Sequence, residues 1–214
     1  MLLGLTAVTG VVDAVSILAL GRVFVANMTG NVVFIGFAIA GAAGFSLIAS
    51  LCGLGGFLVG ASAGGQLIAR LDAERSRLLA MAASAELALL AVATLVVGFS
   101  TPLDASERDL VVLLLAVAMG VQNAVARHLA VPDLTTTVLT MTLTGLASDL
   151  RRGEHGTAVV RRFLAVLAMF AGAVLGATLV IHQNPTFALA IGTALLALVT
   201  SAAWRSAATP SGPG

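Results

Sequence analysis

The chain has 214 residues, of which 59% are hydrophobic and 10% are charged, and its mean hydropathy is +1.07. A soluble domain carries roughly 25% charged residues, so this composition excludes an ordinary water-soluble domain. The net charge is only +1 and the arginines are scattered, which excludes the clustered cations of a nucleic-acid-binding protein. With a single cysteine and three separated histidines, we expect no disulfide, metal site or cofactor.

Apolar stretches follow one another along the whole chain, at about 2–20, 23–41, 45–69, 78–99, 110–127, 134–148, 162–182 and 186–204. A bilayer crossing takes roughly 20 apolar helical residues, and six of the stretches meet that requirement without interruption. The other two, 23–41 and 134–148, are broken by Asn, Gly and Thr. We therefore predict an all-α polytopic membrane protein, with one transmembrane domain over 1–214 that ends in a short polar tail at 205–214.

Two parts of the sequence resemble each other at a spacing of about 110 residues, as expected for an internal repeat. The run from Gly10 to Val15 aligns with the run from Gly120 to Val125. After a gap of one residue, Thr29-Gly30-Asn31 falls opposite Thr140-Met141-Thr142. The pattern predicts a tandem duplication.

The arginines indicate the relative orientation of the two halves. In the first half they follow the Gly-rich stretch 45–69, whereas in the second half they precede its equivalent, 162–182. Because cytoplasmic loops collect Arg, equivalent helices should run in opposite directions. We predict inverted-topology repeats over about 2–99 and 110–204, each with three spanning helices and one re-entrant or broken element. Both termini are then cytoplasmic.

The interrupted segments are the predicted binding site. Non-helical backbone at membrane depth must line a cavity or be buried in protein, and two segments that dip from opposite faces would meet near the midplane. A small polar or ionic solute would be bound by Asp13, Asn27, Thr29, Asn31, Gln122, Asn123, Thr136, Thr137, Thr140 and Thr142. Alternatively, the threonines bond to their own helices and the asparagines join helices together.

Two acidic residues lie well inside apolar stretches and are the candidates for proton coupling. Asp13 lies near the centre of the first helix, where an ionisable group is costly and therefore suggests function. Its repeat equivalent is the neutral Asn123. Asp13 would either change protonation during transport or, as a protonated acid, form a hydrogen-bonded helix clamp with Asn123. Glu86 is the second embedded acid and a second candidate proton station.

Four stretches of the sequence carry a resemblance to a known family. They are Val8-Thr9-Gly10-Val11-Val12-Asp13-Ala14, Asn27-Met28-Thr29-Gly30-Asn31, Gly120-Val121-Gln122-Asn123-Ala124 and Val131-Pro132-Asp133-Leu134-Thr135-Thr136-Thr137. They resemble the bacterial YoaK-like integral membrane proteins, a family of unknown function. The resemblance covers nearly the whole chain and implies a bacterial inner-membrane protein. It brings no substrate and no catalytic residue.

These features predict a small secondary transporter that contacts the lipid bilayer and one small solute, and that is not an enzyme. A passive channel is the alternative, because paired half-helices also build selectivity filters. A helper subunit of another membrane protein is a further alternative. Glycine stripes that are not needed inside one protomer would allow two copies to pair as a homodimer.

Overall fold

The computed structural model describes residues 1–71, 74–100, 102–129, 139–151 and 156–208. These residues form helices and no strands. The helices are α1 (Leu2–Ala19), α2 (Met28–Ile39), α3 (Leu47–Leu71), α4 (Arg75–Phe99), α5 (Ala105–His128), α6 (Leu139–Arg151), α7 (Thr157–His182) and α8 (Pro185–Ala208). Six of them are long and apolar enough to cross a membrane, namely all except α2 and α6.

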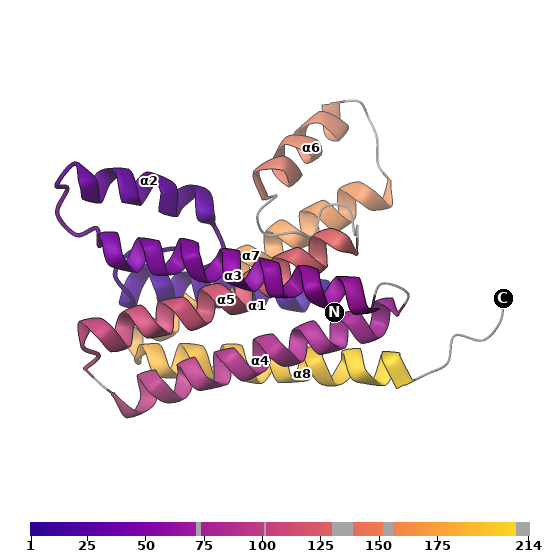
Figure 1. Cartoon of the computed structure of the whole chain (residues 1–214). Coiled ribbons are helices and arrows are strands. Elements are labelled where there is room, and N and C mark those ends of the chain that lie inside the picture. Colours follow the sequence, from indigo (N-terminus) through magenta and orange to yellow (C-terminus); the bar gives the residue numbers. More distant parts are fainter. Residues whose placement is uncertain (72–73, 101, 130–138, 152–155, 209–214) are drawn as a thin grey trace.

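The six long helices form one bundle with α1 and α5 at its centre (Figure 1). In the most apolar part of each helix, 67% of the residues of α5 and 56% of those of α1 are buried, against 17% for α7. The short helices lie on the outside, where α2 packs against α3 and α6 packs against α7. The outer helices therefore present large apolar side chains to the surroundings, as expected for a multi-pass membrane protein.

Glycines allow two pairs of helices to touch at their backbones. A methyl group on Gly172 of α7 would meet the backbone of Ala7 on α1, and one on Gly176 would lie 2.8 Å from the carbonyl oxygen of Val11. Contacts advance in the same direction along both helices, so α1 and α7 are parallel. Small residues permit such close approach between membrane helices.

The second pair, α3 and α5, repeats this arrangement. A methyl group on Gly60 would meet the backbone of Val117, and one on Gly64 would lie 3.1 Å from the carbonyl oxygen of Val121. The pair is again parallel. These glycines are used inside the protomer, so the stripes considered for pairing two copies provide no support for a homodimer.

The third major contact joins α4 and α8 in antiparallel fashion. The Trp204 indole nitrogen donates to the Ser84 hydroxyl at 3.0 Å, and the Thr94 and Thr193 hydroxyls are 3.0 Å apart. As residue numbers rise on α4, they fall on α8. Trp204 is thus held by α4, in addition to its place at the end of the last helix.

The remaining contacts fix the direction of every long helix. On α4, Arg75 donates to the Leu129 carbonyl at 2.9 Å at the end of α5, whereas Glu86 lies beside Gln122, so α4 and α5 are antiparallel. Gly4 on α1 approaches Val199 on α8, and Gly192 approaches Val11, so this pair is antiparallel too. Helices α1, α4 and α7 therefore share one direction, and α3, α5 and α8 share the other.

With these directions, α1 ends and α3 begins at one end of the bundle, so the connection that contains α2 starts and finishes there. Likewise α5 ends and α7 begins at the opposite end, so the connection that contains α6 starts and finishes there. With 12 and 13 residues, α2 and α6 are only about 18–20 Å long, too short for a hydrocarbon core of about 30 Å. The interruptions in stretches 23–41 and 134–148 thus mark helices of a different kind from the other six.

Local sequence sets where the central helix α5 begins. Asp104 caps it, because its carboxylate accepts the Glu107 amide at 2.7 Å while the Glu107 carboxylate accepts the Asp104 amide at 3.0 Å. This reciprocal pair is a capping box. The hydrogen bond from the Glu107 amide lowers the pKa of Asp104 from its ordinary value.

Candidate functional site

The chain turns back sharply after α1. Gly21 and Arg22 have φ values of +94° and +57°, in the left-handed region that reverses the backbone. The segment 20–27 that follows is non-helical, yet Val23, Val25 and Ala26 are fully buried or nearly so. It therefore returns into the bundle instead of crossing its surface.

Asp13 holds the inner end of this segment. Its Oδ1 accepts the backbone amides of Val25 at 3.4 Å and Ala26 at 3.3 Å. Since α1 ends at Ala19, the segment has moved back by about 9 Å along α1 to reach this level. Backbone amides at membrane depth need an acceptor within the protein, and Asp13 provides one.

Asn31, on the first turn of α2, fixes the same segment from its other side. It is fully buried, its Oδ1 accepts the Phe24 amide at 2.9 Å, and its Nδ2 donates to the Phe24 carbonyl at 2.6 Å. The Asn31 side chain thereby gives the backbone amide and carbonyl of Phe24 the hydrogen bonds that a helix or strand would otherwise supply. These contacts lie within the segment that leads into α2, so they bear on neither the solute-binding role nor the alternative that Asn31 joins two helices.

A second set of buried polar side chains, one from each of three long helices, is joined by hydrogen bonds. With its amide oriented to satisfy both sides, Gln122 of α5 donates to Glu86 of α4 at 2.7 Å (Oε1) and 3.0 Å (Oε2), and it accepts the Thr9 hydroxyl of α1 at 3.0 Å. Glu86 is 1% exposed. Because Thr9 lies one helical turn before Asp13 on α1, this set of side chains is next to the contact between Asp13 and the segment 20–27.

The other predicted site residues have varied positions. Asn123 is buried and donates to the Met119 carbonyl of its own helix at 2.8 Å, whereas the hydrogen bonds of Asp13 within the described chain go to Val25 and Ala26. Thr142 is buried. The exposed residues are Asn27, Thr29 and Thr140, and Thr136 and Thr137 lie outside the described residues.

Comparison with known proteins identifies the family. The sequence matches the model of a family described as a protein of unknown function, DUF1275, over residues 1–202. The chain belongs to this family. It is 34% identical over 150 residues to the UPF0700 transmembrane protein YoaK of Bacillus subtilis, a match that covers 70% of this chain and 64% of the relative. No solved structure matches it.

Membership confirms the resemblance seen in the sequence and the multi-pass membrane architecture. The matched region is less than two thirds of the length of the Bacillus protein. Because the family has no assigned function, the chemistry of the site rests on its residues.

The described helices of the two interrupted segments lie apart, since α2 packs against α3 and α6 packs against α7, and Figure 1 shows these two helices well separated. Residues 134–138 of the second segment, where the meeting with 27–31 was also predicted, lie outside the described residues. Each short helix packs against the long helix that comes after it in the chain. The described polar groups converge instead around α1 and α5, through Asp13, Thr9 and Gln122.

Only part of this arrangement could be predicted from the sequence. Asp13, Gln122 and Glu86 were candidates because polar residues inside apolar helices are costly. Thr9 was missed, although it lies at i−4 from Asp13, on the same face of α1. The acceptor role of Asp13 toward Val25 and Ala26 was also missed, since backbone amides leave no mark in a sequence.

Proposed function

We propose that this chain is a small secondary transporter for a small polar or ionic solute. The observation that carries the proposal is the non-helical segment 20–27 held inside the bundle by the Asp13 carboxylate. Irregular backbone and an acid at membrane depth are typical of substrate and ion sites in transporters.

The directions of the helices support an inverted-topology repeat. The parallel pair α1 and α7 and the parallel pair α3 and α5 make matching glycine contacts, and equivalent helices of the two halves run in opposite directions. In this proposal 20–39 is a re-entrant element, with α6 in the equivalent position. Transporters of this class alternate access by rocking one group of helices against another around a fixed site.

The proposed solute site is the face of α1 and α5 that carries Asp13, Thr9, Gln122 and Asn123. Asp13 accepts two amides of the segment 20–27, so a proton or a solute that binds this carboxylate competes with those hydrogen bonds. Release of Val25 and Ala26 would free the segment to move. Solute binding and movement are thereby linked through one side chain.

Transport can be tested in sealed proteoliposomes with the purified full chain. Separate pools of amino acids, organic acids, amines and monovalent cations are placed outside, and their uptake is measured by mass spectrometry with and without a proton gradient. We expect one pool to accumulate above its outside concentration, and accumulation to disappear when an ionophore collapses the gradient.

Two other outcomes would overturn the transporter proposal. Equilibration that never exceeds the outside concentration, with or without a gradient, indicates a passive channel. No uptake from any pool, by protein shown to be folded and inserted, indicates a helper subunit. Empty liposomes and liposomes with the Asp13→Asn variant are the matched controls.

A further inference from the structure

Glu86 is the one titratable residue among the described residues that line the cavity beside it. It faces a cavity of about 10 Å³ that is lined by Leu5, Leu79, Ala82, Ala83, Glu86, Gln122, Val125 and Ala126. A cavity of this size holds about one water molecule. A carboxylate buried without a cation needs strong hydrogen bonds or a proton.

Basic side chains of the neighbouring helices lie near helix ends. On α5, Arg127 and His128 are exposed, as are Arg75 at the start of α4 and Arg205 near the end of α8. On α1, Asp13 is bonded to the segment 20–27. The state of Glu86 is therefore set by Gln122 and by access of water.

The amide of Gln122 satisfies both neighbours in one orientation, in which its nitrogen donates to both oxygens of Glu86 and its oxygen accepts the Thr9 hydroxyl. A half-turn of the amide exchanges its nitrogen and oxygen. The nitrogen would then donate to the Thr9 hydroxyl, which itself donates to the Leu5 carbonyl at 3.0 Å, and the oxygen would face Glu86, where it has a donor only if that carboxyl is protonated.

Each orientation matches one protonation state of Glu86. An ionised carboxylate only accepts hydrogen bonds and therefore requires the amide nitrogen, whereas a protonated carboxyl donates and therefore requires the amide oxygen. We propose that Glu86 is a proton-binding site and that the Gln122 amide turns over with each proton to change the hydrogen bonding of Thr9 on α1. This deepens the proposed function, on which it rests for the use of the proton.

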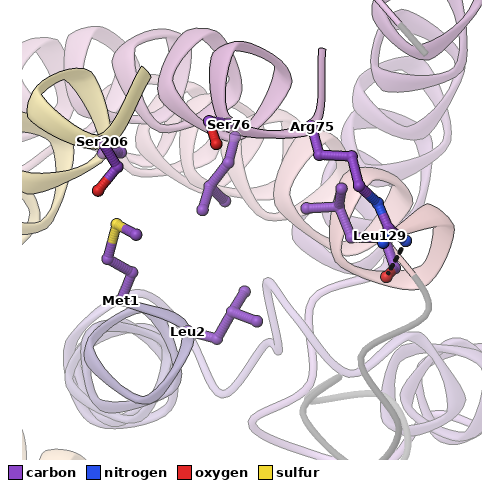
Figure 2. Close-up of a pocket in the computed structure, with 8 residues that line it drawn as sticks. Met1, Leu2, Arg75, Ser76, Leu129 and Ser206 are labelled. Atoms are coloured by element: carbon purple, nitrogen blue, oxygen red, sulfur yellow. Dashed lines mark hydrogen bonds between the residues drawn. The ribbon is translucent and has the colours of Figure 1, made fainter. Parts of the chain in front are cut away.

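A second, larger pocket supplies a route for the proton. It has a volume of about 220 Å³ and is lined by Met1, Leu2, Arg75, Ser76, Leu79, Leu129, Ala203 and Ser206. Figure 2 shows Met1, Ser76 and Ser206 around it, with Arg75 bonded to the Leu129 carbonyl at its edge. Leu79 lines both this pocket and the cavity beside Glu86. The Leu79 side chain is thus the barrier between them, at the end predicted to be cytoplasmic.

The proton site can be tested without any solute. Infrared difference spectra between alkaline and acidic pH, recorded on the full chain in lipid nanodiscs, report protonated carboxylic acids by their carbonyl stretching band. The exposed carboxyls contribute to this band in every variant. We expect the wild type and Asp13→Asn to share one further component of the band, and Glu86→Gln to lack it. Ser84→Ala, on the same helix but outside the group, is the matched control and should match the wild type.

The role of Gln122 predicts a shift in the pH at which this component appears. Gln122→Leu removes charge-assisted hydrogen bonds from the ionised form and a weaker neutral hydrogen bond from the protonated form, so the component should appear at a higher pH than in the wild type. A component lost equally in Asp13→Asn, or a Gln122→Leu variant with an unshifted component, would overturn the proposal.

Labelling provides a second measurement if Gln122→Leu does not fold. A water-soluble carbodiimide reacts with protonated carboxyls, and mass spectrometry locates the adduct. In Leu79→Ala, labelling of Glu86 should rise several-fold over the wild type and fall as pH rises; equal labelling in both proteins would refute the route. Neither measurement uses solute, so failure here leaves the transport proposal intact, and absence of flux leaves the proton site intact.

Discussion

Gly60→Ala tests whether the backbone contact between α3 and α5 holds the bundle together. A methyl group at this position would lie 2.8 Å from the carbonyl carbon of Val117 and 2.9 Å from its Cα, and still closer to the carbonyl oxygen. Ordinary carbon contacts are about 3.5–4.0 Å. The two helices must therefore separate by about 0.7 Å or more, and helix backbones cannot adjust as a side-chain end would.

The same helix offers a matched control. A methyl group on Gly65 would have no neighbour within 4 Å, so Gly65→Ala changes helix propensity without a clash. Both substitutions gain about 1 kcal/mol of propensity, which cancels in the comparison, while overpacking costs about 1–3 kcal/mol. We expect Gly60→Ala to be about 2 kcal/mol less stable than Gly65→Ala, which for a chain of this length lowers the melting temperature by about 4–8 °C.

Thermal unfolding in lipid nanodiscs, followed by the fluorescence of Trp204, measures this difference. Gly172→Ala on α7 should behave like Gly60→Ala, because its methyl group would meet the backbone of Ala7 on α1. If Gly60→Ala and Gly65→Ala melt at the same temperature, the close contact between α3 and α5 does not exist in the membrane and the packing argument fails.

Three further predictions concern topology, the re-entrant segment and coupling. On a Cys52→Ser background, single cysteines placed between α3 and α4 and between α6 and α7 should both resist a membrane-impermeant reagent added outside intact cells. Labelling at either position would refute the inverted repeat. Asn31→Leu should lower the free energy of unfolding by about 2 kcal/mol or more, because it strips partners from two backbone groups, and a variant as stable as the wild type in denaturant would contradict this. Asp13→Asn should fold and still exchange solute, because the amide oxygen accepts the same hydrogen bonds as the carboxylate. It should lose the accumulation that a pH gradient drives, because the amide does not titrate. If accumulation is unchanged, Asp13 is not the proton-coupling residue and Glu86 is the remaining candidate.

The sequence by itself determined that the protein lies in a membrane and which stretches are long enough to cross it. Length, hydropathy and interruption are properties of a single segment, so six long helices and two short ones follow without knowledge of their neighbours. Glycine spacing likewise indicated close-packing faces, because an absent side chain at every fourth residue opens one side of a helix.

Only the tertiary structure decided which groups meet. Asp13 could have faced Asn123, yet its carboxylate accepts the amides of Val25 and Ala26. Gln122 bridges Glu86 and Thr9 from two other helices. Such partners depend on how far each helix is rotated and which helix stands next to it, and those quantities are fixed by the packing of the whole bundle rather than by any local pattern. For the same reason α2 and α6 each follow a neighbouring long helix instead of meeting one another.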